Sequence, residues 1–597
     1  MDTHYPPLEV NSQFDSILQL RDACKQHALR ENFEFSTVKS NKSRYTIKCN
    51  SSDSCPWRLH ASLTLSESDT SKLIEIKTMN ANHSCFGQQK AAHKHASSAL
   101  IASTIQSRLQ EHASYRPSDI VNDMRREHGL QIGYWTAWRA KETAFANING
   151  THESAFSHLP QYCEDIIRSN PGSTAIVERT PDNHFLRMFV SYAAFGKGFA
   201  YCRAVLGLDG SHLKSRYQGV LLAATTVDAN GSLFPVSYAV VSAENDDNWS
   251  WFIDNLHNVI QMHAPTFLKP QMLVFISDRQ KGLLEAVEKV FPGSPHGYCL
   301  RHLYENLHKL FKHKDLRSLL WEAARAISAE AFNEAIEKMC GISPPAVDWL
   351  LSHADPAHWC EFYFPGHRYG HLTSNIAESL NAWLLEAREK PVLAMFEQMR
   401  HQSMQWFDKR RHIDTNTEGL LVSTAAKSIQ STLNLRARRY RIISADDNAY
   451  EVFSLETSRN YVVKVSDHTC TCWSWQSTGL PCGHAIAVSL NRKENPQALA
   501  APFYTLMAYQ ETYRNAIYPP NLDAADTQLY IPTGASESSE DTDSMDLLPP
   551  STHRPTGRPK KRRIRGAAER EGRDKRAFRC SRCKQAGHSV RSCKQPI

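Results

Sequence analysis

Two short apolar runs in the sequence each end in an aspartate, and the two carboxylates are candidates for metal-dependent chemistry. Residues 205–208 lead to Asp209, and residues 272–277 lead to Asp278. Continuous apolar runs of this kind are typical of buried strands in parallel or mixed sheets. Carboxylates at the ends of two neighbouring strands could share divalent metal ions. The alternative is that each aspartate only caps the turn or helix that follows its strand.

Three further clusters combine cysteine and histidine in the proportions of a structural zinc site. Each offers three thiolates and one imidazole, a set that binds zinc tetrahedrally, and together they use nine of the 15 cysteines. The ligand candidates are Cys49, Cys55, His83 and Cys85 in the first cluster, Cys470, Cys472, Cys482 and His484 in the second, and Cys580, Cys583, His588 and Cys593 in the third. Because the N-terminal residues lack the basic and apolar regions of a secretory signal, we expect zinc rather than disulfides.

The elements around the two aspartates are predicted to form a single sheet. Apolar runs predict strands at residues 185–190, 205–209, 219–228 and 233–241. Asn230-Gly231, between the last two, is a strong hairpin signal. A helix from residue 248, the strand before Asp278, a helix at 281–290 and a short strand at 296–300 follow. Counted from residue 205, this order is the layout of a ribonuclease-H-like sheet. The first and fourth strands of such a sheet are neighbours, which would place Asp209 beside Asp278.

The motifs in this region resemble the transposase core of Mutator-like elements. They are Asp209-Gly-Ser-His-Leu-Lys, Gly219-Val-Leu-Leu-Ala-Ala, Asp228-Ala-Asn-Gly, Glu244-Asn245 with Trp249, Ser277-Asp278-Arg-Gln-Lys-Gly282, and Cys299-x2-His302 with Asn306. The resemblance is dense over residues 205–310. It implies a ribonuclease-H-like DDE transposase core over residues 185–410, with a helical insertion at 303–370.

The same resemblance implies a third acid after the insertion, and it maps to Glu378. The spacing of Ile376, Leu380 and Trp383 places Glu378 on a helix, where a lone glutamate would otherwise be an ordinary solvated residue. The resemblance implies that the three acids hold two Mg²⁺ or Mn²⁺ ions for DNA cleavage and strand transfer. Cys299 and His302 are implied near-site residues, and the sequence leaves open whether they bind metal or only shape the site.

Residues 10–95 are predicted to form a small domain that zinc would stabilise. A helix over residues 10–32 precedes strands at 44–49, 55–61 and 73–79, and the first Cys/His cluster lies at the strand ends. Four unrelated buried residues are the alternative. The segment resembles the N-terminal DNA-binding domain of MuDR-type transposases and far-red-impaired-response proteins. The matching residues are Tyr45, Cys49, Cys55-Pro56-Trp57-Arg58, His83 and Cys85. The resemblance implies DNA binding, with Trp57 and Arg58 as candidate contacts.

Two helices are predicted within the helical segment at residues 100–150. Pro117 opens the first, Gly129 closes it, and the second begins after Gly133. A helix-turn-helix is one interpretation, and a packed helical hairpin without DNA contact is equally consistent with the spacing. The candidate DNA face consists of Trp135, Trp138, Arg139 and Lys141.

The C-terminal part contains the other two Cys/His clusters. A basic helix is predicted over residues 425–441. Residues 448–492 then resemble a SWIM zinc finger, on the pattern C-x-C-x9-C-x-H of the second cluster. Residues 578–597 have zinc-knuckle spacing, which is typical of modules that bind single-stranded or exposed nucleic acid.

Residues 531–577 are predicted to be a disordered linker, first acidic and then basic. The net charge of the chain is +7, and residues 554–577 hold eleven Lys/Arg against three Asp/Glu, so the basicity belongs to this tail. Gly557-Arg558-Pro559 with its basic neighbours resembles an AT-hook, and a nuclear import signal is the alternative. The candidate DNA contacts here are Arg558, Lys560, Lys561, Arg562 and Arg563.

The composition, with 41% hydrophobic and 22% charged residues, is typical of a soluble globular chain, and no apolar stretch approaches the roughly 20 residues of a membrane span. We therefore predict a multidomain protein of α+β and α/β class, with a ribonuclease-H-like DDE core flanked by small zinc-binding domains. The predicted function is a nuclear, oligomeric DNA transposase with three structural Zn²⁺ sites that acts on double-stranded DNA. One alternative is a domesticated transcription regulator, and another is a metal-dependent nuclease without strand transfer.

Overall fold

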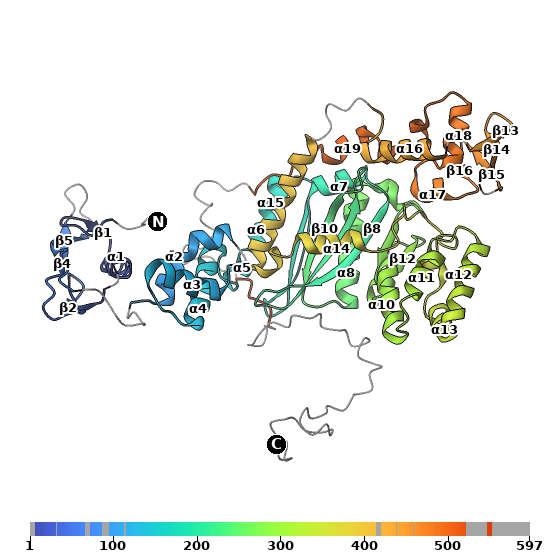
Figure 1. Cartoon of the computed structure of the whole chain (residues 1–597). Coiled ribbons are helices and arrows are strands. Elements are labelled where there is room, and N and C mark those ends of the chain that lie inside the picture. The colour runs from blue at the N-terminus through green and yellow to red at the C-terminus, as the bar shows by residue number, and fades with distance from the viewer. Residues whose placement is uncertain are drawn as a thin grey trace, which may run out of the picture. The chain divides into compact units, whose positions relative to one another are not determined.

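The structure is a computed structural model, and Figure 1 shows the whole chain. It describes residues 6–31, 33–65, 72–85, 95–112, 115–412, 419–436, 439–456, 458–520 and 546–551. The chain divides into two units, Met1–Thr552 and His553–Ile597. The predicted AT-hook-like block and the third Cys/His cluster lie outside the described residues, as does most of the predicted linker.

The N-terminal residues form an antiparallel sheet with the strand order β1-β5-β4-β3-β2, and helix α1 packs against it. The elements are β1 (Gln13–Phe14), α1 (Ile17–Arg30), β2 (Phe35–Ser40), β3 (Arg44–Cys49), β4 (Arg58–Leu65) and β5 (Lys72–Asn80). The predicted helix is confirmed, but it starts at residue 17 rather than 10. Its N-cap is Ser16, whose side chain accepts a hydrogen bond from the Gln19 amide, and the preceding Gln13–Phe14 pairs with β5 instead.

Three helices follow and share a core of their own. They are α2 (Ser98–Glu111), α3 (Pro117–His128) and α4 (Tyr134–Asn149). The predicted boundaries of α3 are confirmed, because Pro117 is its first residue and Gly129 ends it with φ +63°. A positive φ at that position suits glycine, which has no Cβ. The packing of Ile101, Ile105 and Ile120 against the alanines of α4 therefore joins the helices into one unit.

The central sheet has seven strands in the order β12-β11-β8-β9-β10-β7-β6. Figure 1 labels β8, β10 and β12 of this sheet. The strands are β6 (Thr174–Arg179), β7 (Phe185–Ser191), β8 (Val205–His212), β9 (Val220–Val227), β10 (Leu233–Val241), β11 (Val274–Ser277) and β12 (His296–Tyr298). Strand β11 runs parallel to both of its neighbours, whereas the remaining pairs are antiparallel. The predicted adjacency of the two aspartate-bearing strands, β8 and β11, is confirmed.

Helices cover this sheet and join its strands. They are α5 (Ser154–Ser157), α6 (Leu159–Ser169), α7 (Ala193–Phe199), α8 (Asp246–His263), α9 (Lys281–Val290), α14 (Asn375–Trp383) and α15 (Val392–Arg411). Helix α14 contacts β8, β9 and β10, and α8 packs against α9, β7 and β10. The buried side chains of the sheet and these helices form the largest hydrophobic core of the described residues.

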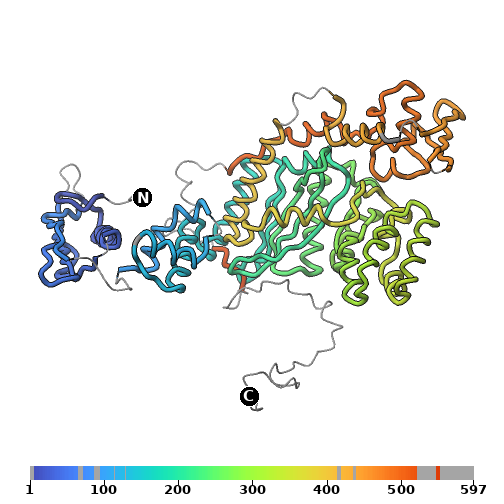
Figure 2. Tube along the Cα trace, viewed as in Figure 1, coloured from blue at the N-terminus to red at the C-terminus, as the bar shows by residue number. Residues whose placement is uncertain are grey.

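A helical insertion separates β12 from α14, as predicted. Its helices are α10 (Leu300–Leu310), α11 (Leu316–Ala324), α12 (Ala329–Ile342) and α13 (Pro344–His353). The Cα trace in Figure 2 leaves the sheet after β12, passes through these helices and returns to the sheet as α14. Leu303, Leu320 and Met339 belong to a second hydrophobic core, so the insertion is packed in its own right.

The chain then forms α16 (Ser423–Arg436) and a third sheet, which has four strands in the order β13-β14-β15-β16. The further elements are β13 (Tyr440–Ser444), β14 (Ala449–Ser454), β15 (Asn460–Lys464), β16 (Thr469–Cys470), α17 (Ser474–Thr478), α18 (Gly483–Asn491) and α19 (Leu506–Tyr513). The predicted basic helix over 425–441 is wrong at its end. Arg441 lies in β13 opposite Phe453, because Tyr440–Ser444 pairs with β14. In the described part of the chain, no helix is both long and apolar enough to cross a membrane.

Candidate active site and metal centres

Strands β8 and β11 bring Asp209 and Asp278 together. The parallel pairing sets Val205 opposite Val274 and Gly207 opposite Ile276. The same register, continued by two residues, sets Asp209 opposite Asp278. Both side chains are partly buried. The Asp209 carboxylate accepts hydrogen bonds from Asn381 Nδ2 at 2.7 Å and from the Gly210 amide at 3.1 Å, which fix its orientation.

Glu378 reaches the same site from the first turn of α14. This helix approaches β8 closely at Gly207, where a Cβ would lie 3.5 Å from both Ile376 Cβ and the Ala377 amide nitrogen. Both carboxylate oxygens of Glu378 pair with the guanidinium of Arg301 on α10. Asn381, the hydrogen-bond donor to Asp209, follows Glu378 by three residues, so one face of α14 serves both acids.

The electrostatics of the site show an excess of negative charge. The pKa of Asp209 is raised from 3.8 to about 7, mainly by burial and then by the charges of Asp278 and Glu378, whereas nearby His302 opposes the shift. A divalent cation would relieve this repulsion. Carboxylate oxygens are the ligands that Mg²⁺ and Mn²⁺ prefer. Three carboxylates are the donor type that a hard divalent metal takes, but the three acids are not among the groups of described residues whose ligand atoms all lie within 4.8 Å of one another.

Cys299 and His302 form a hydrogen-bonded pair beside the three acids. Burial would raise the pKa of the Cys299 thiol, but the hydrogen bond with His302 and the Ser374 amide together lower it. The hydrogen bond to Cys299 raises the pKa of His302 to about 9, with further support from Asp278 and Asp209. At neutral pH His302 is thus a cation that offsets part of the acidic charge. Ligand atoms of Cys299, His302 and Glu378 also lie within 4.8 Å of one another, close enough to share a metal ion.

The first Cys/His cluster is assembled as the sequence predicts. Cys49 Sγ lies 3.7 Å from Cys85 Sγ, and His83 Nδ1 lies 3.3 Å from Cys55 Sγ and 3.5 Å from Cys85 Sγ. Zinc–sulfur bonds of about 2.3 Å in a tetrahedron place neighbouring sulfurs roughly 3.8 Å apart. Cys49 ends β3, whereas Cys55 and the pair His83 and Cys85 lie in the loops next to β4 and β5. The geometry therefore fits one zinc ion.

The second cluster has the same chemistry on a different scaffold. Cys470 ends β16, Cys472 precedes α17, and Cys482 and His484 lie at the start of α18. His484 Nδ1 lies 3.6 Å from Cys470 Sγ and 3.8 Å from Cys482 Sγ. Hydrogen bonds with the other two thiols lower the pKa of Cys472. A thiolate is the form that binds zinc. Four protein ligands leave no open position, so this site is structural.

The candidate DNA contacts divide into buried and exposed residues. Trp57, predicted to contact DNA, is fully buried, and its ring stacks at 5.5 Å on the ring of the cluster ligand His83. That prediction is corrected, because Trp57 packs the interior behind the metal cluster. Its neighbour Arg58 is exposed.

The candidate face of α4 is also mixed. Trp135 is 72% and Trp138 41% exposed, and Arg139 is exposed beside them. Lys141 Nζ instead donates a hydrogen bond to the Tyr115 carbonyl, so it ties α4 to the start of α3.

Sequence reasoning gave no role to three residues that build the acidic site. Asn381 orients Asp209, and Arg301 pairs with Glu378. Arg388 donates hydrogen bonds to the His212 carbonyl at 3.3 Å and to the Asn381 carbonyl at 3.2 Å, which joins the end of β8 to α14. Asn381 carries a sequence signal, since it lies one helical turn after Glu378. Arg301 lies between the near-site residues Cys299 and His302, but that motif assigns it no role, and Arg388 lies in none of the quoted motifs.

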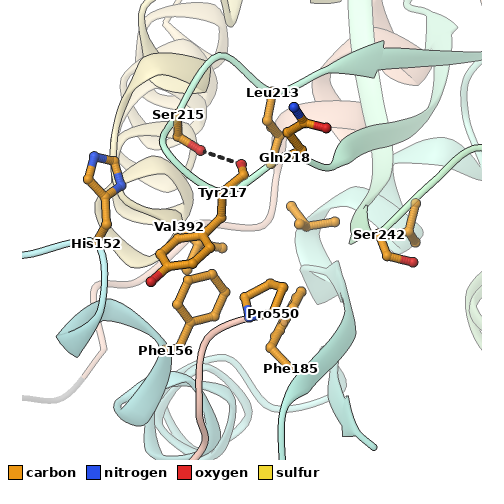
Figure 3. Close-up of a pocket in the computed structure, with 12 residues that line it drawn as sticks. His152, Phe156, Phe185, Leu213, Ser215, Tyr217, Gln218, Ser242, Val392 and Pro550 are labelled. Carbon is orange, nitrogen blue, oxygen red and sulfur yellow. Dashed lines mark hydrogen bonds between the residues drawn. The ribbon is translucent and has the colours of Figure 1, made fainter. Parts of the chain in front are cut away.

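A small pocket elsewhere in the core is lined by Phe156, Phe185, Tyr217 and other largely apolar residues (Figure 3). Its volume is about 20 Å³, which is room for roughly one water molecule. None of the three acids lines it. This pocket is therefore no candidate for a site that admits DNA.

Comparisons with known proteins match three segments of the chain. Residues 205–306 match the family described as MULE transposase domain, residues 8–76 match MuDR family transposase, and residues 461–493 match SWIM zinc finger. The first match contains Asp209 and Asp278 but ends before Glu378. The last contains all four ligands of the second cluster.

Among curated proteins, the chain is 25% identical over 201 residues to the transposase for insertion sequence element IS905 of Lactococcus lactis subsp. lactis (strain IL1403). The match covers 32% of this chain and 49% of that protein, so the chain spans about half the length of the curated relative it matches. A solved structure titled AFT2 in complex with DNA matches 21% of this chain and 98% of its own, at 17% identity and a TM-score of 0.13 that supports no conclusion about fold. Over three separate segments, the chain is thus similar to a MULE transposase domain, a MuDR family transposase and a SWIM zinc finger.

Proposed function

We propose that this protein is a DNA transposase of the Mutator-like class, with a ribonuclease-H-like core that cleaves DNA and transfers strands. The observation that carries the proposal is the meeting of Asp209, Asp278 and Glu378 at one site with excess negative charge. The matches at residues 205–306 and 8–76 support it, because both families are transposase families. The order of strands around β8 and β11 agrees with the proposed core.

In this proposal Asp209, Asp278 and Glu378 hold Mg²⁺ or Mn²⁺. When bound, the ions activate the attacking oxygen and stabilise the departing 3′ oxygen of an in-line displacement. Asn381 keeps the Asp209 carboxylate in one orientation, and Arg301 does the same for Glu378. His302, charged through its bond to Cys299, offsets acidic charge so that the acids can approach one another.

The proposed DNA contacts come from several parts of the chain. The zinc-stabilised N-terminal domain would recognise element ends, with exposed Arg58 among its contacts, and Trp135, Trp138 and Arg139 would add to this surface. Outside the described residues, the basic block and the zinc knuckle would contribute salt-dependent affinity and nuclear import. Pairing two element ends would require more than one copy of the chain.

The charge of the insertion supports a DNA path along the insertion. Residues 309–325 hold five Lys/Arg and two Asp/Glu, whereas residues 326–350 hold one lysine and four Asp/Glu. The basic part contains an open cleft of about 460 Å³ lined by Lys314, Arg317, Ser318, Trp321 and Arg325. Arg317 stacks over Trp321, with its guanidinium carbon 5.4 Å from the ring centroid. Cations on a rigid aromatic support suit a phosphate backbone.

Cleavage of a labelled duplex that carries the terminal inverted repeat of the encoding element tests the proposal. We expect Asp209→Asn, Asp278→Asn and Glu378→Gln each to lower Mg²⁺-dependent cleavage by roughly a thousandfold or more, with end binding in a gel shift unchanged. Exposed Glu386→Gln, eight residues after Glu378, is the matched control and should cleave normally. Full cleavage by any of the three variants would remove that residue from the site. End binding without cleavage by the unmodified chain would favour a domesticated regulator instead.

A further inference from the structure

The loop at residues 369–374 carries the chain from the insertion into α14 and so precedes Glu378. Its first two residues, Tyr369 and Gly370, have φ values of +51° and +80°. On one side, the loop is tied to the near-site residues. The Leu300 amide donates to the Leu372 carbonyl at 2.9 Å, and the Ser374 amide donates to Cys299 Sγ at 3.3 Å. The position of this loop therefore determines where α14 begins.

On its other side the loop contacts residues from two distant parts of the chain. The Tyr369 ring meets the Phe503 ring edge to face, with centroids 5.0 Å apart. Arg203 Nη1 lies 3.4 Å from His371 Nε2, and the Arg203 guanidinium carbon lies 4.9 Å from the centroid of the Tyr504 ring. Burial and then the charge of Arg203 lower the pKa of His371 to about 4, so the imidazole is neutral and its Nε2 can accept the bond from Arg203.

Phe503 and Tyr504 are in turn fixed to the zinc finger. Gly479 ends α17, between the second and third cysteines of the cluster, and has φ +74°. A Cβ at Gly479 would lie 2.8 Å from Phe503 Cζ, so only glycine allows this approach. The Ala501 amide donates to the Gly479 carbonyl at 2.8 Å, and the Tyr504 hydroxyl donates to the Thr478 carbonyl at 2.9 Å. The contacts run without a break from the finger to the loop.

We propose that Arg203, Phe503 and Tyr504 are positioning residues that brace loop 369–374 against the zinc finger and thereby hold Glu378 in place. The importance of Glu378 rests on the proposed function, but the brace itself is a property of the folded chain. In this arrangement the finger does more than stabilise its own fold. It is the outer support of an element that carries one of the three acids.

Hydrogen exchange of the full-length protein without DNA tests the brace directly. In Arg203→Ala and in Tyr504→Ala, we expect amides of residues 369–378 to exchange at least about tenfold faster, while those of residues 8–76 keep their rates. Unchanged rates at residues 369–378 in both variants would overturn the proposal. Faster exchange spread evenly over β8, β9 and β10 would also overturn it, because the contacts would then serve general packing alone.

A cleavage assay adds a measurement, the Mg²⁺ requirement, that a purely structural role would not change. In both variants we expect the Mg²⁺ concentration for half-maximal cleavage to rise about fivefold or more, with element-end binding unchanged. Arg203→Lys keeps the charge and should restore part of the metal affinity. If the unmodified chain does not cleave, the proposed function fails while the exchange experiment still decides the brace. A normal metal requirement in a variant with fast exchange at residues 369–378 would contradict the link to Glu378.

Two further variants separate the contact between Tyr504 and α17 from the contact between Tyr504 and Arg203. Tyr504→Phe removes only the hydroxyl that contacts Thr478 and keeps the ring beneath Arg203, so we expect faster exchange in α17 and a smaller effect at residues 369–378. Tyr513→Phe is the matched control, because its hydroxyl bonds Asp228 and Arg410 rather than the loop. The control should leave the exchange rates of residues 369–378 unchanged. If Tyr513→Phe accelerated exchange there as much as Tyr504→Ala does, the brace would not be specific.

Discussion

The acidic site and the second Cys/His cluster are both suited to metal, yet they are assembled in opposite ways. The four ligands of the cluster lie within residues 470–484, on one hairpin end and the helix after it. The three acids come from two strands and a helix, with the whole insertion between Asp278 and Glu378. A local cluster would depend on its metal to hold a small fold, whereas the proposed acidic site would depend on a large fold to hold a metal.

The negative charges of the two sites are also balanced by different groups. A bound zinc ion would balance the thiolates of the cluster, and in small zinc-binding folds loss of the metal removes the fold. The acidic site is partly balanced by protein cations, since Arg301 pairs with Glu378 and His302 lies near both aspartates. We therefore expect metal removal to unfold the finger and to leave the central sheet intact.

The largest effect should follow from removing one zinc ligand. Structural zinc supplies about 10–16 kcal/mol in finger peptides at neutral pH. We expect Cys472→Ser to lower the zinc content by about one ion per chain and to abolish exchange protection in β14, β15 and α18. Cys340→Ser, at an exposed free cysteine, is the control. Retention of both zinc and protection in Cys472→Ser would show that the finger folds without this ligand.

A bulky residue at Gly207 should affect the acidic site and leave both clusters intact. Because α14 packs directly on Gly207, Gly207→Leu must push the helix from β8, at a cost of about 1–3 kcal/mol in the free energy of unfolding. A displacement of about 1 Å at Glu378 could lower cleavage by roughly a hundredfold. Gly207→Ala, whose Cβ would make only ordinary contacts, is the matched control. Equal cleavage by the two variants would mean that α14 does not position Glu378.

The smallest effect concerns pH. The pKa of Asp209 is raised from 3.8 to about 7, first by burial and then by Asp278. The folded protein thus favours the protonated acid. The stability gained from that proton is complete below about pH 4 and is lost as the pH rises through about 7.

Because a divalent ion must displace this proton, we expect apparent metal affinity to fall about tenfold for each pH unit below about 7. Titration of Mn²⁺ binding between about pH 5 and 8 measures the slope. Asp209→Asn should bind weakly with a flat pH dependence. A slope of zero in the unmodified protein would place the proton elsewhere.

The same contrast explains which features the sequence could reveal. Both clusters in the described residues follow from spacing, because a hairpin brings close any ligands near its ends. Asp209 and Asp278 follow from strand patterns. Glu378 needed a family resemblance, since a hundred residues separate it from Asp278 and helical periodicity carries information about neighbouring residues only. Arg388 lies in none of the quoted motifs, and Arg301 occupies a variable position of the Cys299-x2-His302 motif. Trp57 shows the reverse error, because an aromatic residue beside a zinc ligand can pack the interior instead of contacting DNA.

Replacement of one acid by cysteine tests most directly whether the aspartates hold the catalytic metal. A thiolate is a poor ligand for Mg²⁺ and a better one for Mn²⁺ or Zn²⁺. We expect Asp278→Cys to lose Mg²⁺-dependent cleavage of an element end and to regain part of it in Mn²⁺, while Asp278→Asn stays inactive in both metals. Cleavage by Asp278→Cys that persists in Mg²⁺, or that is lost equally in Mg²⁺ and Mn²⁺ with the fold intact, would contradict a metal ligand at Asp278.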